Sequence, residues 1–241
     1  MSSYLFIDVE TSGFGDNAAV VEIAAIPYID GEYLPHYQSY IAPHIGATMD
    51  AKAFEVNGIN VSSLKDYPIK DTVDSFIKWI DTHEKVFTIV AHNAKFDKEK
   101  LYQLFCRTAN YGDFVTKFRF NHVCTMELAK ELFKNKKKKP EGFSLAKLCK
   151  FFGISLINAH SALPDIEATV QLYEELKKMK AKDLPIAKEL TYLEKRRKYM
   201  AMDYLTINPE GDIYINCKAT KDSDAMSFIL SEIYDITVSD L

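Results

Sequence analysis

The sequence predicts an α/β fold: a mixed five-stranded sheet, with three antiparallel strands followed by parallel strands, flanked by helices and extended by a small C-terminal appendage. Three apolar runs rich in aromatic and β-branched residues follow one another closely near the N-terminus, separated only by turn residues, which is typical of antiparallel strands. Later apolar runs are separated by segments whose apolar residues recur at helical spacing. A strand reached through a helical crossover is normally parallel to its neighbour, so these later runs make the sheet mixed.

The expected strands are short apolar runs bounded by turn residues. The loop with Gly13 and Gly15 separates the first two, and a turn at Asp30 and Gly31 separates the next two. The segment 43–70 has prolines and glycines among short apolar groups, so loops and a short helix are expected there. The five strands are 4–9, 18–27, 34–42, 86–91 and 118–123.

The expected helices carry apolar residues three and four positions apart. The first is capped by Asp71, and the second follows Asp97. The fourth ends at Gly153, and the last tolerates Pro164 in its first turn. The apolar residues of the first helix lie between 73 and 80, and those of the second lie between 101 and 105. The other three helices are expected at 125–133, 143–152 and 161–179.

The chain is expected to form one main domain over residues 1–181 and a C-terminal extension over residues 182–241. The extension differs in character and predicts a helix, a β-hairpin and a second helix, at about 186–200, 205–215 and 224–234. Its role is unknown.

Composition limits the classes of partner. With 47% hydrophobic residues the chain can bury a substantial core, and its formal net charge of −4 means that contact with phosphates must be local. Four widely separated cysteines fit neither a zinc ribbon nor a disulfide framework. No window is long and apolar enough to span a bilayer. We therefore expect a cytoplasmic protein without a membrane partner, whose oligomeric state the sequence leaves open.

Asp8 and Glu10 place two carboxylates at the end of an otherwise apolar strand. Side chains alternate along a strand, so both carboxylates face the same side of the sheet. Two adjacent acids repel each other, and a buried charge needs a partner, for which a divalent cation is the simplest choice. The alternative is a frayed strand end, at which both are solvated or bonded to the following turn.

Two further acids can reach the same edge of the sheet. Asp97 lies at the start of a helix just after a strand, and Asp165 lies in the first turn of the long helix. Hard oxygen ligands without cysteines suit Mg²⁺ or Mn²⁺ rather than zinc. Four carboxylates around one cleft suit two metal ions about 3.5–4 Å apart, which together stabilise the attacking and leaving oxygens of a phosphoryl displacement. His160 stands shortly before Asp165 and could act as the base for a water nucleophile.

Three segments resemble, in order, the motifs of the DEDDh 3′-to-5′ exonucleases, the group that includes the proofreading subunit of bacterial DNA polymerase III. They are Asp8-Val-Glu-Thr-Ser-Gly13, His92-Asn-Ala-Lys-Phe-Asp97 and His160-Ser-Ala-Leu-Pro-Asp165. Each motif alone is only suggestive, but three in order within fitting strand and helix contexts are specific. The resemblance covers roughly residues 3–180. It implies a ribonuclease-H-like fold, in agreement with the sheet predicted above.

The resemblance also implies roles for individual residues. Asp8 bridges two Mg²⁺ or Mn²⁺ ions, and Glu10 and Asp165 complete one of the two metal sites. Asp97 serves the other site, and His160 activates water. Relatives often carry a histidine where Asn57 stands, which bears on the contacts of that loop with the terminal nucleotide. The candidate substrate-binding residues are Thr11, Ser12, Gly13, Phe14, Asn57, His92 and Asn93.

Several of these positions have structural alternatives. His92 and Asn93 also suit hydrogen-bonded residues that order a strand-to-helix turn, and Glu22 suits a bond to a nearby loop better than metal binding. Phe14 suits a core position or, as in such enzymes, a wedge against the terminal bases, because stacking on unpaired bases tolerates any sequence. The lysine run 136–139 suits a solvated loop or, beside the cleft, contact with phosphates.

The predicted function is a two-metal-ion 3′-to-5′ exonuclease that hydrolyses phosphodiester bonds of DNA or RNA and releases nucleoside 5′-monophosphates, in proofreading or nucleic-acid processing. The expected partners are a single-stranded or frayed 3′ end and, as a candidate, a DNA polymerase. The alternative is a non-catalytic or weakly active module of the same fold that binds nucleic acid or a polymerase. The motif residues contact phosphate and metals rather than the sugar, so the sequence does not separate DNA from RNA.

Overall fold

A mixed sheet of six strands organises the part of the chain that the computed structural model describes, which is residues 3–157, 159–183, 205–207 and 213–215. The strand order is β3-β2-β1-β5-β6, and β4 also pairs with β2. β1 pairs antiparallel with β2 and parallel with β5, which pairs parallel with β6. The predicted mixed sheet is confirmed. The strands are β1 (Tyr4–Thr11), β2 (Val20–Ile29), β3 (Glu32–Tyr33), β4 (Tyr37–Tyr40), β5 (Phe87–Ala91) and β6 (Phe118–Cys124).

The third strand, expected at 34–42, is wrong in its extent: only β4 (Tyr37–Tyr40) lies within that range, and a separate two-residue strand, β3 (Glu32–Tyr33), precedes it and also pairs with β2. Pro35 lies in the gap between them. Proline has no backbone N–H to donate to the neighbouring strand, so a continuous ladder cannot pass through it.

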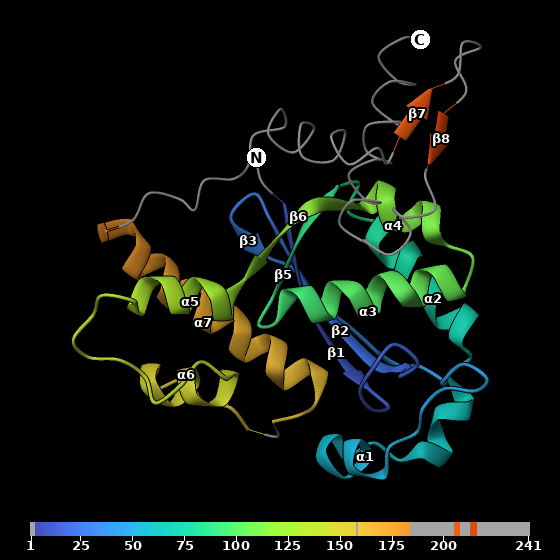
Figure 1. The fold of residues 1–241 in the computed structure, drawn as a ribbon, viewed down its shortest axis with the longest axis horizontal. Coiled ribbons are helices and arrows are strands. Elements are labelled where there is room, and N and C mark those ends of the chain that lie inside the picture. Colours follow the sequence, from blue (N-terminus) through green and yellow to red (C-terminus); the bar gives the residue numbers. More distant parts are fainter. Residues whose placement is uncertain (1–2, 158, 184–204, 208–212, 216–241) are drawn as a thin grey trace. The chain divides into compact units, whose positions relative to one another are not determined.

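The helices alternate with the later strands, as predicted (Figure 1). The prediction that Asp71 caps its helix is wrong: in α2 (Ile69–Asp81) the cap position is Pro68, and Asp71 lies in the first turn. A short helix at 111–117 had no counterpart in the sequence-based prediction. The helices are α1 (Ala51–Asn57), the 3₁₀ helix η1 (Val61–Asp66), α2 (Ile69–Asp81), α3 (Ala94–Arg107), α4 (Tyr111–Lys117), α5 (Thr125–Phe133), α6 (Leu145–Phe152) and α7 (Ala162–Asp183).

The two faces of the sheet pack against different helices. Leu5 and Ile7 belong to a buried cluster that also contains apolar residues of α2 and α3. Phe6 lies in a second cluster with Ile166 and Tyr173 of α7. Because side chains alternate along β1, Asp8 and Glu10 lie on the same face as Phe6, which is the face that α7 covers. In Figure 1, α3 and α7 accordingly lie on opposite sides of β1.

The chain divides into two compact units, Met1–Asp183 and Leu184–Leu241. In the second unit the described residues form an antiparallel pair, β7 (Leu205–Ile207) and β8 (Ile213–Ile215), which confirms the predicted hairpin strands. The helices predicted at about 186–200 and 224–234 lie outside the described residues. Among the described residues, none of the helices is both long enough and apolar enough to cross a membrane.

Candidate active site

Three carboxylates meet at the end of β1. Asp8 and Glu10 come from β1, and Asp165 comes from the first turn of α7, which packs on the same face of the sheet. One carboxylate oxygen from each residue lies within 4.8 Å of the others. Oδ1 of Asp165 is buried and has no hydrogen-bond partner in the described part of the chain. Unpaired buried oxygens of this kind are costly, so the cluster is suited to a positively charged ligand.

The ionisation of these carboxylates reflects the same crowding. Burial, followed by repulsion from Asp165, Glu22 and Asp97, raises the pKa of Glu10 from 4.5 to about 7. Burial raises the pKa of Asp165 as well. Burial also raises the pKa of Asp8 well above its usual value, with added repulsion from Asp97 first and Glu10 next. A divalent cation would favour the ionised form of each group and offset these shifts.

Asp97 lies close to Asp8 but outside the group of three oxygens. It sits in the first turn of α3, on the other side of the sheet from α7, and is buried. Its Oδ1 accepts a hydrogen bond from the backbone N–H of Val9 at 3.3 Å. Burial raises its pKa to about 7, against the opposing effect of the Val9 N–H. Asp8 is therefore influenced both by Asp97 and by its partners in the group of three, Glu10 and Asp165.

Glu22 connects the sheet to the start of α7. It pairs with Glu10 across β1 and β2 and is buried. Its Oε2 accepts a hydrogen bond from the backbone N–H of Ala162 at 3.1 Å, and its Oε1 accepts one from the side chain of Gln38 at 2.7 Å. Glu22 thus forms hydrogen bonds within the protein, as expected, but its partners lie in α7 and β4 rather than in a loop. By fixing the first residue of α7, Glu22 sets the position of Asp165.

His160 lies immediately before α7, as predicted, with its side chain exposed. Its backbone is in the left-handed region, with φ of 70°. Its backbone N–H donates a hydrogen bond to Oδ2 of Asp165 at 3.3 Å. This bond orders the turn next to the carboxylate cluster and leaves the imidazole at the surface.

Four of the candidate substrate-binding residues lie at the last residue of β1, Thr11, and in the loop that follows it. Thr11 Oγ1 donates to the carbonyl of Gly13, while Ser12 is fully buried and its hydroxyl donates to the carbonyl of Thr48. A side chain at Gly13 would place its Cβ only 3.1 Å from the Cβ of Asp50, which explains a glycine there. Phe14 is 85% exposed, so it is not a core residue.

The other three candidates lie around the same end of the sheet. Asn57, the last residue of α1, is buried, and its side-chain N–H donates to the carbonyl of Thr11 at 3.5 Å. His92 follows β5, with Nε2 3.0 Å from the carbonyl of Phe143 and Nδ1 3.0 Å from the hydroxyl of Thr125. Since a carbonyl only accepts, Nε2 carries the proton, and burial lowers the pKa of this imidazole. His92 therefore orders the turn, and the exposed Asn93 stands at the start of α3.

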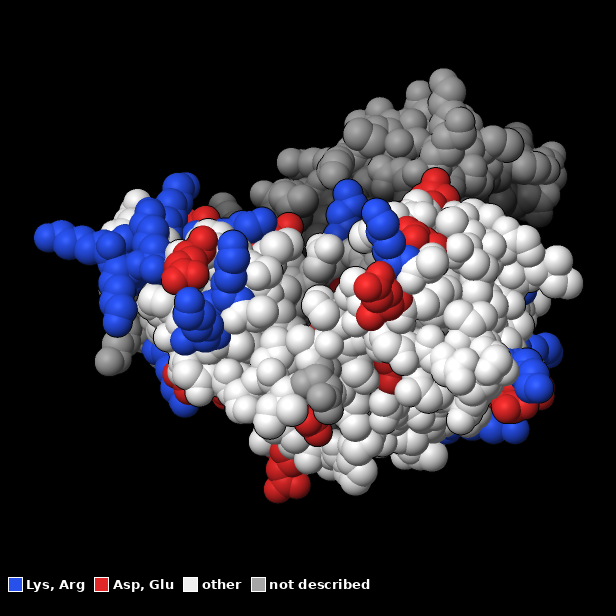
Figure 2. Space-filling view, turned by 90° about the horizontal axis from the view of Figure 1, so that it is seen from below, with Lys and Arg blue, Asp and Glu red and all other residues white. Residues whose placement is uncertain are grey.

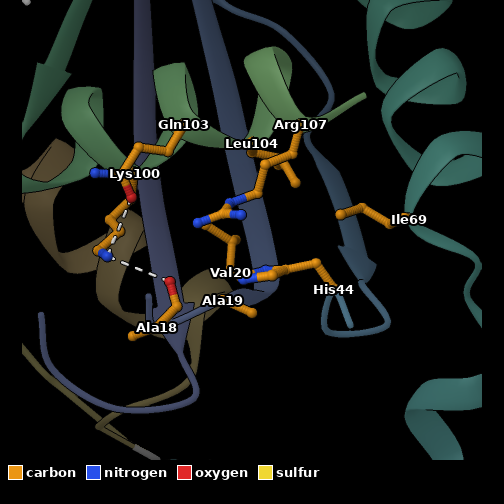
Figure 3. Close-up of a pocket in the computed structure, with 9 residues that line it drawn as sticks. All are labelled: Ala18, Ala19, Val20, His44, Ile69, Lys100, Gln103, Leu104 and Arg107. Atoms are coloured by element: carbon orange, nitrogen blue, oxygen red, sulfur yellow. Dashed lines mark hydrogen bonds between the residues drawn. The ribbon is translucent and has the colours of Figure 1, made fainter. Parts of the chain in front are cut away.

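Sequence reasoning missed two residues that support this region. Gln38 bonds to Glu22. Lys100, three residues after Asp97 on α3, is buried, and its ammonium group donates to the carbonyls of Gly15 and Ala18 (Figure 3). Helical periodicity could have indicated that Lys100 is buried, because it shares a face of α3 with the buried residues Asp97 and Leu104.

The donor set fits a divalent cation. All four candidate ligands are carboxylates, which are the hard oxygen donors that Mg²⁺ and Mn²⁺ prefer. The unpartnered Oδ1 of Asp165 is the independent observation that agrees with such an ion. The fold and the site thus define an α/β protein with a cluster of carboxylates, suited to a divalent cation, at the end of one strand.

A family model for exonucleases, RNase_T, matches residues 5–173. The chain is also 32% identical over 178 residues to the PolC-type DNA polymerase III of Bacillus cereus and 31% identical over 172 residues to that of Bacillus subtilis. These matches cover 73% and 70% of this chain but only 11% of each polymerase. The chain therefore belongs to the RNase_T exonuclease family.

Solved structures share this fold. Escherichia coli exonuclease I in complex with a dT13 oligonucleotide matches with a TM-score of 0.64 and 18% identity, over 86% of this chain and 47% of that one. The nuclease domain of 3'hExo, a DEDDh family member bound to rAMP, matches with a TM-score of 0.60 and 13% identity, over 73% of this chain and 92% of that one.

Proposed function

We propose that this chain is a divalent-metal-dependent exonuclease that removes nucleotides from the 3′ end of single-stranded or frayed DNA, and of RNA where the site admits it, releasing nucleoside 5′-monophosphates. The observation that carries the proposal is the convergence of Asp8, Glu10 and Asp165 within 4.8 Å, beside the buried Asp97. Such a concentration of negative charge is unfavourable without cations. Membership of the exonuclease family supports nuclease chemistry.

Each acidic residue has a proposed place around two Mg²⁺ or Mn²⁺ ions. Asp8 would contact both ions, Glu10 and Asp165 would complete one site, and Asp97 would serve the other. This division is supported by the neighbours of Asp8: burial raises its pKa most, and repulsion from Asp97 as well as from Glu10 raises it further. When bound, two such ions stabilise negative charge on the attacking and leaving oxygens of a phosphoryl displacement.

His160 is the proposed general base, which accepts a proton from the attacking water at a ring nitrogen. His160 is exposed, and its backbone N–H is bonded to Asp165 of the carboxylate cluster. Solvent access allows the proton to leave after each turnover, and a base placed in this way typically contributes about 10²–10⁴ in rate.

Substrate contacts are proposed for two surfaces. Phe14, which is 85% exposed beside the site, would stack against unpaired bases near the 3′ end. Lys136–Lys139, between α5 and α6, would contact phosphates farther along the strand. Figure 2 shows a group of Lys and Arg side chains projecting at the end of the molecule at which α5 and α6 lie in Figure 1. A DNA polymerase is proposed as a partner because this chain is similar to one part of PolC-type DNA polymerases.

A cytoplasmic location is also proposed. Cys106, Cys124 and Cys149 are free thiols in the structure. Unpaired cysteines fit a reducing compartment.

The proposed activity is tested with a panel of end-labelled substrates: single-stranded DNA, duplex DNA with matched or mismatched 3′ ends, and RNA. Each is incubated with Mg²⁺, Mn²⁺ or excess chelator. The proposal predicts that a 5′-labelled strand shortens stepwise and that a 3′ label is released at once as a mononucleotide, only with metal. Release of a 5′-terminal label before any shortening, or binding without hydrolysis on every substrate, would contradict it.

A further inference from the structure

The segment 13–18 follows β1, whose end carries Asp8 and Glu10, and it contains the exposed Phe14. Two of its carbonyls bind the ammonium group of Lys100, a residue that is 4% exposed. Nζ of Lys100 donates to the carbonyl of Gly15 at 2.7 Å. It also donates to the carbonyl of Ala18 at 3.2 Å and to Oε1 of Gln103 at 3.3 Å, and Figure 3 shows these last two partners. The three donors of the ammonium group thus each have an acceptor, and two of the acceptors belong to the segment that carries Phe14.

A buried lysine is costly to maintain, because burial disfavours its charged form. An apolar residue at this position of α3 would fill the same space without that cost. The carbonyls that Lys100 binds explain why a lysine stands here. Backbone carbonyls near an apolar core need hydrogen-bond donors, and the ammonium group of Lys100 donates to two of them. Its observed contacts are those of a residue that fixes a loop.

The same helix face supplies a second contact with the segment. Arg107 Nη2 donates to the carbonyl of Asp16 at 3.5 Å. Lys100 and Arg107 are two helical turns apart, so they lie on one side of α3. Both line a hollow of about 10 Å³, with His44 opposite (Figure 3), which has room for about one water molecule and is too small for a ligand.

We propose that Lys100 is a positioning residue, which fixes the segment 13–18 to α3 and so holds Phe14 in register with the carboxylate cluster. Asp97 and Lys100 lie three residues apart on this rigid helix. The helix α3 therefore fixes the positions of both a candidate metal ligand, Asp97, and the segment with Phe14, on which the last base of the nucleic acid would stack. The inference rests on the proposed function, because it assigns a nucleic-acid strand as the ligand of Phe14.

If Lys100 has this role, replacing it should weaken binding of the nucleic-acid strand without changing the chemical step at the carboxylates. Lys100→Met removes the donors and keeps the apolar stem. It should raise KM for a single-stranded oligonucleotide about tenfold, the order expected for loss of one stacked base, while kcat changes less than twofold. Hydrolysis of bis(4-nitrophenyl) phosphate, a phosphodiester without bases, should stay within twofold of the wild type.

The matched control is Lys98→Met. Lys98 lies on the same helix and is 6% exposed, but its Nζ donates to the carbonyl of Phe120 in β6 at 2.5 Å. This variant should leave KM for the oligonucleotide within twofold. Phe14→Ala should reproduce the effect of Lys100→Met, and the double variant Phe14→Ala with Lys100→Met should be no worse than either single variant, because both act on one contact.

Amide hydrogen exchange of the full chain gives a readout that does not depend on activity. Exchange in residues 13–18 should accelerate in Lys100→Met relative to both the wild type and Lys98→Met. Arg107→Met, an exposed change, should show a smaller acceleration and serves if Lys100→Met does not fold. The proposal is overturned if exchange in this segment is unchanged in the folded variants, or if Lys100→Met lowers the rates on both substrates equally. Absence of hydrolysis by the wild type would refute the proposed function, while exchange would still decide the role of Lys100.

Discussion

At the scale of single residues, the site depends on acids that are more difficult to ionise than isolated carboxyl groups. Burial and mutual repulsion raise the pKa of Glu10 from 4.5 to about 7 and burial raises that of Asp97 from 3.8 to about 7. The folded protein without metal therefore binds more protons than the unfolded chain between about pH 4 and pH 7. The contribution of these two groups to the free energy of unfolding is therefore largest below that window and falls as pH rises through it.

We predict that, in chelator, the protein has a lower melting temperature at pH 8 than at pH 5. The shift of Glu10 alone corresponds to on the order of 3 kcal/mol, at about 1.4 kcal/mol per pKa unit. Mg²⁺ should raise the melting temperature more at pH 8, where the carboxylates are ionised. Glu10→Gln is the control, because it removes one titrating group and should reduce the difference between the two pH values. Equal pH dependence of the wild type and the variant would contradict this account.

His160→Ala should lower single-turnover hydrolysis by about 10²–10⁴, the usual contribution of a positioned base, with little change in the metal concentration required. A base must be neutral to accept a proton, so the acidic limb of the pH–rate profile should flatten. His36→Ala, which alters another exposed histidine, serves as the control. A wild-type rate and an unchanged acidic limb in His160→Ala would make His160 structural.

Strand alternation made part of the site predictable from the sequence, since it places Asp8 and Glu10 on one face of β1. The spacing of Asp165 in α7 followed from helical periodicity. The sequence could not predict that Asp97 would lie outside the group of three oxygens, because this depends on α3 packing against the opposite face of the sheet. It also did not predict the buried Lys100, whose partners are backbone carbonyls of a loop and carry no side-chain pattern.

At the scale of elements, α7 is positioned by a bond to the sheet. Glu22 accepts the backbone N–H of Ala162 and so fixes the helix start three residues before Asp165. Element types were mostly predictable, because α3, α5, α6 and α7 have clear apolar periodicity. The break at Pro35 and the short α4 were not, since short elements are decided by the packing around them.

We predict that Glu22→Ala lowers the free energy of unfolding by about 1–3 kcal/mol, the cost of leaving buried donors unpaired, as measured by urea denaturation. Hydrolysis should also fall, because Asp165 loses its fixed position. Glu22→Gln is the control, because its amide oxygen can still accept from Ala162 and the amide of Gln38 can rotate. Wild-type stability and rate in Glu22→Ala would show that α7 is positioned by apolar packing alone.

At the scale of the whole molecule, the chain divides into two units, and all the candidate site residues belong to the first. We predict that truncation after Lys182 leaves metal-dependent hydrolysis measurable, while affinity for substrate or partner changes. Circular dichroism establishes whether the truncated chain folds. A folded truncated chain that is inert on every substrate would place the extension in the active site.

The central claim is that the carboxylate cluster binds the divalent cations that cleavage from the 3′ end requires. The most direct measurement is the single-turnover rate of nucleotide release from a 5′-labelled strand as a function of Mg²⁺ concentration, for the wild type, Asp8→Asn and Asp71→Asn. Asp71 is an exposed acid in α2 and provides the control. The account predicts no release in chelator, a saturable Mg²⁺ dependence for the wild type and Asp71→Asn, and a much slower rate with a higher Mg²⁺ requirement for Asp8→Asn. Release by the wild type in excess chelator, or an unchanged Mg²⁺ dependence in Asp8→Asn, would contradict it.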